Sequence, residues 1–370
     1  MNRRLSLKKK VFCFCGIDVR ILKQRGQPML LQGRELYLGD YMDKDEEKMR
    51  GEKKNQHFVP RSFLRGFAVD SKNSLIWGYD KKYSSCAGKR SINKICSADY
   101  YYEQLKSDSS KTQILEDGFE TVEKSAIKFI RNLSVSHKLS SKAKGCLAYF
   151  IGLLLTRGPS FRDGIHEFHK HAAEITLQKL YKSGRVPEPP AILKKEIVNN
   201  DITSVVKAEI LPHVSLKYML DSANSISQSF HNKKWDIYYI KNGENFVTSD
   251  TPVIFQNINP EVNQAIGPEH PQSLILCPIT KKILIAIRPY FKSDCSSFEF
   301  MPVKDGMVNK INESMCFNAQ RFVYASENSQ ELLEYIKKSK GMSKRLKSYR
   351  FGDAIISRWD IDVNNTEDSK

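Results

Sequence analysis

The amino-acid sequence predicts an α+β fold, with a helical middle block packed against a mostly antiparallel C-terminal β-sheet. Between residues 114 and 182, apolar residues recur at steps of three and four, which is the period of an amphipathic helix. From residue 235 onward, short runs rich in β-branched and aromatic residues are separated by turn residues, as in strands. A helical block followed by a strand block is typical of α+β rather than α/β proteins.

The composition bounds the size, the partners and the compartment. The 370 residues can bury one large core or two smaller ones. The formal charge of +17, from 59 Lys and Arg against 42 Asp and Glu, favours nucleic acid or nucleotides as partners. The eight cysteines form no C-x-x-C pair and no zinc spacing, which is typical of a reducing cytoplasm. The longest apolar run, at 146–156, is too short to span a bilayer, so we expect a cytoplasmic protein without a transmembrane segment.

Residues 1–54 are heavily charged and lack clear periodicity, and we expect a flexible or mis-annotated N-terminal arm. Gly39-Asp40-Tyr41 would be encoded by a purine-rich sequence of the kind that binds ribosomes, directly before Met42. One hypothesis is therefore that translation starts at Met42. The alternative is a genuine but flexible arm.

Residues 55–68 read NQHFVPRSFLRGFA and predict a short helix from Pro60 to Gly66, because proline is favoured at the first helical position. Arg61 and Arg65 are four apart and share one side of that helix, and His57 lies in the extended chain before it. An imidazole and two guanidinium groups beside the N–H groups of a helix start suit an anion, especially phosphate. In the alternative, His57 binds a backbone carbonyl and both arginines are solvated.

The chain then predicts a small β-rich part and the helical block. Strands are expected at 74–81, which is rich in Ile, Trp and Tyr, and more weakly near 89–95. The clearest helical periodicity covers 114–133, 139–157 and 161–182, with Gly158-Pro159 between the last two. A rigid loop at 184–190 and further helices at 191–199 and 202–230 complete the block.

Arg157 ends the apolar helix that reads LLLTRGP, so its guanidinium is expected to be buried. A buried guanidinium needs a carboxylate, and Glu116 or Glu123 on the preceding helix would supply one. We interpret Arg157 as part of an ion pair between packed helices, with substrate binding as the alternative.

No metal motif stands out. In HEFHKH, at 166–171, Glu167 and His171 would face one side of a helix and would hold a metal, but an exposed pair of this spacing explains them equally well. We therefore predict no metal site from this motif. The sequence also lacks the P-loop, the dinucleotide-binding and the hydrolase-elbow signatures.

The last third predicts the sheet. Asn242-Gly243 is a strong hairpin signal between 235–241 and 245–250. A short turn joins a second pair of strands, and two later strands complete the antiparallel sheet: 274–279, 283–288, 298–303 and 321–326.

Asp250 lies where one of these strands ends, in FVTSDTP, and Pro252 prevents simple continuation of the strand. An aspartate in this place would orient a histidine, bind a metal or cap a turn.

Residues 331–370 predict a basic C-terminal helix and tail. The run KKSKGMSKRLKSYR, at 337–350, holds seven basic residues and no acidic one. Lys344, Arg345 and Lys347 are the candidate nucleic-acid contacts in this run, and a solvated helix face is the alternative.

Several stretches together resemble DUF 4238, a bacterial family known as a domain of unknown function. They are HFVPRSFLRGFA, LIWGYDK, SADYYYE, ILEDGFETVEKSAIKFI, LLLTRGPSFR, FVTSDTP, LILCPITKK and VNKINESMCFNAQRFVYAS. The resemblance implies a single α+β domain over 55–330 but no established activity. It strengthens the expectation that His57, Arg157 and Asp250 form one site, since these residues lie in the most distinctive motifs.

Two functions are consistent with this sequence. In the first, a nuclease-like enzyme acts on a phosphate-containing substrate, with antiviral defence as a conceivable setting. There His57 is the general acid or base, Arg61, Arg65 and Arg157 hold the substrate, and Asp250 orients His57 or binds a divalent metal ion. In the second, the protein binds nucleic acid or another protein without catalysis. The enzyme hypothesis requires the catalytic residues to meet in one pocket.

Overall fold

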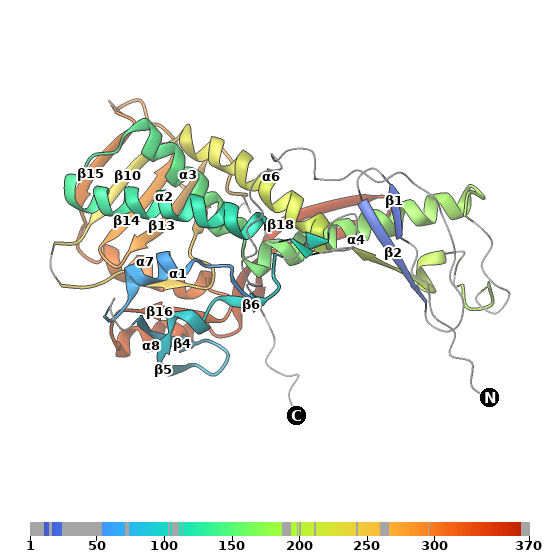
Figure 1. Ribbon diagram of the computed structural model, residues 1–370, viewed down its shortest axis with the longest axis horizontal. Coiled ribbons are helices and arrows are strands. Elements are labelled where there is room, and N and C mark those ends of the chain that lie inside the picture. The colour runs from blue at the N-terminus through green and yellow to red at the C-terminus, as the bar shows by residue number, and fades with distance from the viewer. Residues whose placement is uncertain are drawn as a thin grey trace.

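The computed structural model describes residues 11–14, 17–23, 54–70, 74–102, 104–105, 111–112, 114–186, 194–197, 199, 201–210, 212–241, 243–259, 266–294 and 296–363. The predicted start at Met42 lies outside these residues, as do 191–193 and 198 of the helix predicted at 191–199. The described chain has an α+β fold, as predicted, with a wide body and an arm that extends around helix α4 (Figure 1).

A five-stranded sheet forms the centre of the body. Its strands, in spatial order, are β12 (Ile254–Asn257), β13 (Ser273–Thr280), β14 (Ile283–Arg288), β10 (Lys234–Tyr239) and β15 (Phe298–Pro302). Neighbouring strands are antiparallel, except that β10 and β15 are parallel.

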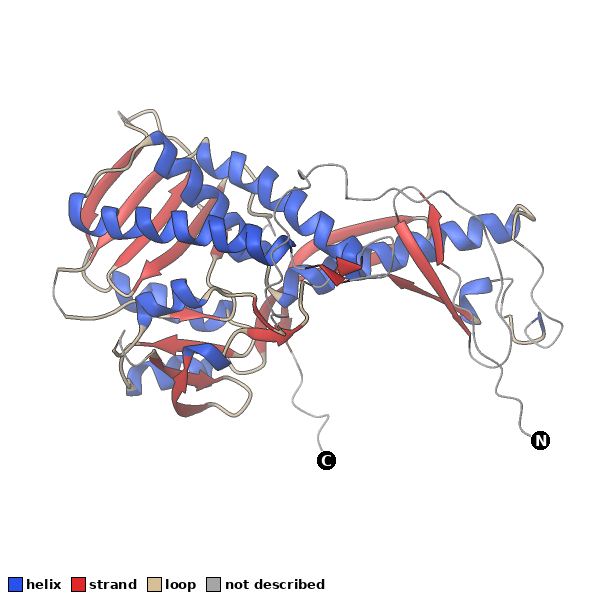
Figure 2. Cartoon of the chain, viewed as in Figure 1, coloured by secondary structure: helices blue, strands red, loops and turns tan. Residues whose placement is uncertain are grey.

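Three long helices cover one face of this sheet (Figure 2): α2 (Ile114–Ser136), α3 (Ser141–Thr156) and α6 (Pro212–His231). Successive residues of a strand point to opposite faces. Ile285 and Ile287 accordingly join the core under the helices, whereas Leu284 and Ala286 join a second core on the other face.

The second core lies between the central sheet and a four-stranded antiparallel sheet. That sheet has the order β11 (Thr248–Ser249), β16 (Phe322–Ala325), β4 (Leu75–Asp80) and β5 (Ser85–Ser91). Helices α7 (Met307–Asn318) and α8 (Gln330–Lys338) contribute Met315 and Ile336 to the same core.

The N-terminal motif connects both parts of the body. Strand β3 (Asn55–His57) pairs with β6 (Ser97–Asp99). The predicted short helix follows as α1 (Arg61–Leu64) and a 3₁₀ turn, η2 (Arg65–Phe67). Their apolar residues Phe63, Leu64 and Phe67 are buried in the same core as Ile285 and Ile287, between the central sheet and the three long helices.

The arm is built on helix α4 (Pro159–Lys182), which packs against a long hairpin, β17 (Met342–Phe351) and β18 (Ala354–Val363). Farther along the arm, β1 (Val11–Phe14), β2 (Ile17–Lys23) and β9 (Val206–Ile210) form a small sheet. In the described part of the chain, no helix is long and apolar enough to cross a bilayer.

The predicted hairpin around Asn242-Gly243 is wrong, because β10 and β11 belong to different sheets. Phe246 is fully buried in the second core and its N–H binds the carbonyl of Lys281, so the chain crosses from one sheet to the other here. Burial of the apolar residues after the turn therefore overrides the local turn signal. The strands predicted at 298–303 and 321–326 were expected to complete one antiparallel sheet. They are observed as β15 in the five-stranded sheet and β16 in the four-stranded sheet.

The helix predicted over 202–230 begins only at Pro212, after strand β9. The predicted basic helix and tail differ as well: α8 ends at Lys338 and the hairpin β17–β18 follows. Gly352, with φ of 59°, and Asp353 form the two-residue turn, a pairing typical of hairpins.

Helix α4 and strand β17 approach each other closely at Gly164. A Cβ atom on Gly164 would lie far inside van der Waals contact with the carbonyl oxygen of Leu346. The position therefore requires glycine because of the neighbouring backbone.

We expect Gly164→Ala to lower the free energy of unfolding by about 1–3 kcal/mol, because the helix and the hairpin must move apart. Gly118→Ala on α2 is the matched control, since nothing lies within 4 Å of its Cβ position and alanine favours a helix. Urea unfolding of both variants measures the difference. Equal stability of the two variants would contradict the close crossing.

Candidate functional site

Arg157, immediately after α3, is buried and forms polar contacts with three other segments of the chain. Its side chain is 2% exposed, and its Nη1 lies 2.7 Å from Glu123 Oε1 on α2. The predicted ion pair between packed helices is thus present, with Glu123 as the partner. The guanidinium also donates from Nη2 to the carbonyl of His57, at 2.7 Å, and from Nε to the Tyr102 hydroxyl, at 3.0 Å. Arg157 therefore fixes the backbone of β3 from the protein interior.

His57 is held between β6 and α1, and 9% of it is exposed. Burial, and then the positive charges of Arg61 and Arg157, lower its pKa from 6.5 to about 4, against the effect of a backbone hydrogen bond with Ile92. The imidazole is therefore neutral at pH 7. Its Nε2 atom is buried and has no hydrogen-bond partner within the described structure.

Arg61 and Arg65 are exposed on the short helical segment after His57. Arg61 Nη1 donates to Asn93 Oδ1 at 3.5 Å. Arg61 therefore lies over the 3₁₀ turn Ile92–Lys94, whose Ile92 backbone forms a hydrogen bond with His57. Arg61 and Arg65 are the parts of the predicted substrate site that reach the surface.

Asp250 follows β11 and binds the loop between α7 and β16. Its carboxylate accepts the backbone N–H groups of three consecutive residues, Gln320, Arg321 and Phe322, at 2.8–2.9 Å. Burial raises the pKa of Asp250, and the three N–H groups oppose that shift. The capping role considered for this aspartate is therefore present at this loop.

A hydrogen bond joins two of the three residues expected to form one site. Arg157 touches His57, but among the described residues no hydrogen bond or ion pair joins Asp250 to either of them. The charge on Lys81, not His57, is the neighbouring charge that most lowers the pKa of Asp250.

The three basic candidates near the C-terminus lie on strand β17. Lys344 lies 3.7 Å from the centroid of the Phe255 ring and donates to the Phe255 carbonyl at 2.7 Å. Burial lowers its pKa to about 8. Arg345 Nε donates to Ser343 Oγ at 3.2 Å, and Lys347 follows on the same strand.

Glu167 and His171, considered as metal ligands, instead hold the edge of β17. Glu167 accepts the N–H of Ser348 at 3.0 Å, and His171 Nε2 lies 3.2 Å from the Ser348 carbonyl oxygen. Within the described ranges no group of three or more His, Cys, Asp or Glu side chains is arranged to hold a metal.

A cavity of about 450 Å³ lies where the start of α3, the end of α6 and the start of β15 meet. We call it the lysine pocket. Its lining residues are Leu139, Ser140, Ser141, Lys144, His231, Asn232, Tyr290, Ser297 and Phe298. None of these residues is in the predicted site.

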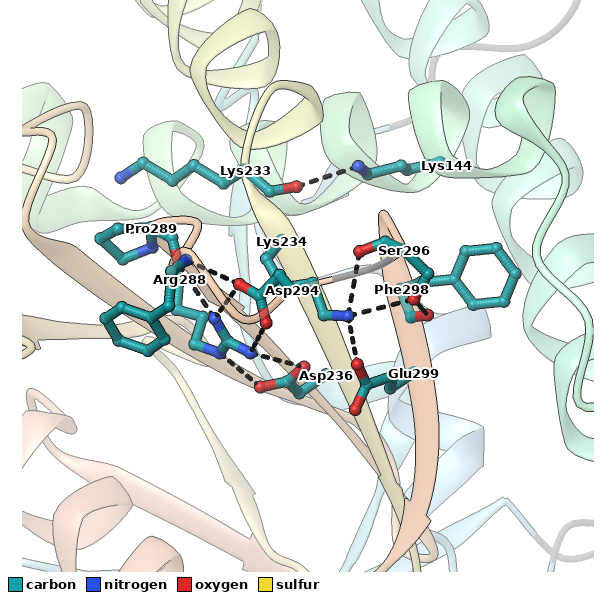
Figure 3. Close-up of polar contacts among 11 residues, drawn as sticks. Lys144, Lys233, Lys234, Asp236, Arg288, Pro289, Asp294, Ser296, Phe298 and Glu299 are labelled. Atoms are coloured by element: carbon teal, nitrogen blue, oxygen red, sulfur yellow. Dashed lines mark hydrogen bonds and ion pairs between the residues drawn. The ribbon is translucent and has the colours of Figure 1, made fainter.

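Lys144 is the buried charge of the lysine pocket. It is 6% exposed, and its ammonium donates to the carbonyl of Lys233 at 2.9 Å (Figure 3). Burial and the charge of Lys234 lower its pKa. Lys234 has a carboxylate, Glu299 Oε1, at 2.6 Å, whereas no ion pair to Lys144 is found among the described residues.

His231 adds a buried polar atom to the pocket. Nδ1 of His231, at the end of α6, is buried without a hydrogen bond in the described structure. Ser140 caps α3 by accepting the N–H of Ala143. The pocket therefore combines an ammonium, an imidazole and a helix N-terminus, which all favour an anion.

The loop 289–294 contributes Tyr290 to the lining of the pocket, and Arg288 binds Asp294 at the end of this loop (Figure 3). Arg288 binds Asp236 at 2.6 Å and Asp294 at 2.7 Å, and Asp294 accepts the N–H of Phe291 at 2.7 Å. The pKa of Asp294 is held well below its usual range by Arg288. This arrangement leaves Tyr290 48% and Phe291 50% exposed.

Replacing His57 by Gln should change how stability depends on pH. The unfolded chain takes up a proton near pH 6.5, but folded His57 resists it until about pH 4. The native state therefore loses stability as the pH falls from 6.5 to 4, by at most about 3 kcal/mol from this group. Urea unfolding at pH 7 and pH 4.5 should show a smaller loss for His57→Gln than for wild type. Parallel losses would contradict the neutral, buried imidazole.

The model of the family described as "Protein of unknown function (DUF4238)" matches residues 55–329. No curated protein and no solved structure gives a significant match. The match covers most of the chain, from β3 to the residue before α8, and so includes both sheets and the lysine pocket. The chain therefore belongs to the DUF4238 family.

Proposed function

We propose that this protein binds single-stranded nucleic acid, with a phosphate group in the lysine pocket and no catalytic step. The observation that carries this proposal is the ammonium of Lys144, which is buried in a cavity without a carboxylate among the described residues. Burying an unpaired charge is costly, and a bound phosphate would offset that cost.

Neighbouring groups support a phosphate rather than a carboxylate of another protein. The N-terminus of α3 carries a partial positive charge, and Ser141 and Ser297 add hydroxyl donors to the lining. Lys142 and Lys292 are both exposed; Lys142 follows the lining residue Ser141 directly, and Lys292 lies two residues after Tyr290. The net charge of +17 would draw a polyanion to the protein from a distance.

The aromatic side of the pocket favours a strand with unpaired bases. Tyr290 lines the pocket, and about half of its surface is exposed. Bases of single strands stack on exposed aromatic side chains, which contributes about 1–3 kcal/mol per base. The Arg288–Asp294 ion pair fixes the loop, so Tyr290 is presented without a large ordering cost.

Nuclease-like hydrolysis by His57 and Asp250, with or without a divalent metal, gains less support. The oxygens of Asp250 are occupied by three backbone N–H groups, and Nε2 of His57 is buried. Arg157 is turned inward. Arg61 and Arg65 remain surface groups that would assist binding of a polyanion, and Arg345 and Lys347 would do so from the arm.

Lys144→Met is expected to weaken binding of a short single-stranded oligonucleotide by about 10- to 100-fold at low salt, because a charge-assisted hydrogen bond is lost. The melting temperature should stay constant or rise, since the variant no longer buries an ammonium. Lys310→Met, an exposed lysine on α7 that does not line the pocket, is the control and should change affinity only slightly. Fluorescence anisotropy and a thermal melt give both quantities. Equal effects of the two variants would refute the pocket.

Affinity should also fall as the pH is raised, and earlier than for an exposed lysine. Burial lowers the pKa of Lys144, so its ammonium loses its proton below the ordinary value of 10.5. Lys144→Arg keeps its charge throughout this range and should bind with little dependence on pH. Titration of the oligonucleotide between pH 7 and pH 10 compares the two proteins. Identical pH profiles would rule out Lys144 as the phosphate ligand.

A further inference from the structure

The two outer edges of the hairpin β17–β18 differ. On β17, the backbone groups of Ser348 that point away from β18 bind Glu167 and His171 of α4. Ser160 of the same helix donates to the carbonyl of Lys344 at 3.4 Å. Helix α4 thus supplies polar side chains where a neighbouring strand would otherwise lie.

Among the described residues, no side chain forms such hydrogen bonds with the outer edge of β18. Ser357 is the partner of Ser348, and in an antiparallel pair both residues of a non-hydrogen-bonded position point their backbone groups outward. The N–H and C=O groups of Ser357 therefore point away from β17, as do those of Ile355, Trp359 and Ile361. No strand in the described ranges pairs with this edge.

This edge is long and partly apolar. Strand β18 has ten residues, and Ile356 and Ile361 are 53% and 68% exposed. Soluble proteins usually shorten, charge or cover an edge of this kind, because it is a template for pairing with another strand.

We propose that β18 pairs with β18 of a second copy of this chain, antiparallel, about a two-fold axis through Trp359. This register places Arg358 opposite Asp360 of the second copy, and Asp360 opposite Arg358. Their side chains lie at non-hydrogen-bonded positions, where opposing side chains are closest.

The charges of the strand select this register over its neighbours. Shifting the axis by one residue toward the N-terminus places Arg358 opposite Arg358 of the other copy. The opposite shift places Asp360 opposite Asp360. Within one chain, Arg358 Nε lies 2.9 Å from Asp360 Oδ2, so both groups already lie on one face of the strand.

The same register covers the exposed isoleucine. Ile361 falls opposite Ser357 of the second copy and diagonal to its Trp359, within the reach of large side chains across an antiparallel pair. Trp359 itself is fixed by Phe255 and Phe161, with ring centroids at 5.0 and 6.3 Å, so the edge is presented rigidly. A rigid edge loses little conformational freedom on association.

Sedimentation equilibrium of the full chain tests the proposal through a charge exchange. Wild type should be a dimer at micromolar concentration. Arg358→Asp and Asp360→Arg should each weaken the dimer by about tenfold or more, because like charges then face each other twice. The double variant, Arg358→Asp with Asp360→Arg, should recover the dimer, since the opposite charges meet again.

Ile361→Lys provides a second route that does not touch the ion pair. A lysine on an exposed edge blocks strand pairing, and the side chain is exposed enough that folding should survive. Val135→Lys is the matched control, because Val135 on α2 is 86% exposed and far from the hairpin in the sequence. A monomeric wild type would overturn the proposal. So would a dimer that Ile361→Lys and the single charge reversals leave unchanged, or one that Val135→Lys disrupts equally.

Discussion

The buried guanidinium of Arg157 joins three segments that are far apart in the sequence. It binds Glu123 on α2, the carbonyl of His57 in β3 and the hydroxyl of Tyr102, and it stacks against the ring of Phe119 at 4.3 Å. Removing one member of a buried ion pair costs about 3–5 kcal/mol, because the other charge remains without compensation. The position of β3, and through it α1 and the buried residues Phe63 and Phe67, depends on this contact.

A second polar connection joins the four-stranded sheet to the start of the hairpin β17–β18. Lys81, 2% exposed, donates to the carbonyls of Ala319 and Met342 at 2.7 Å, and Asp250 holds the N–H groups of the same loop from the other side. Two of the motifs that make the chain resemble its family, LIWGYDK and FVTSDTP, thus supply the side chains that hold the loop between α7 and β16. Their distinctive sequence is explained by backbone hydrogen bonding in a dry interior, where an unsatisfied group is costly.

The long helices were predictable because the pattern of apolar residues depends on one local period, and α2, α3 and α4 follow it closely. An ion pair between Arg157 and a carboxylate of α2 was predictable for a similar reason, because a buried charge needs an opposite charge, but the choice of Glu123 over Glu116 depends on tertiary packing. The division of the strands between two sheets was not predictable, since Phe246 is placed by tertiary burial. The lysine pocket was also missed, because Lys144, His231 and Tyr290 are brought together from three separate segments and form no motif.

The order of strands in the four-stranded sheet has a consequence for synthesis on the ribosome. Strand β4 lies between β5 and β16, and Asp80 at its end binds Arg321, which is 241 residues later in the chain. At a synthesis rate of about 5–20 residues per second, roughly 10–50 s pass between the synthesis of β4 and that of its partner strand β16. During that interval one edge of the β4–β5 hairpin, including the apolar residues of LIWGYD, has no strand beside it. Folding of the body is therefore a late and largely post-synthetic event, in which the nascent chain depends on keeping that edge from pairing with other chains.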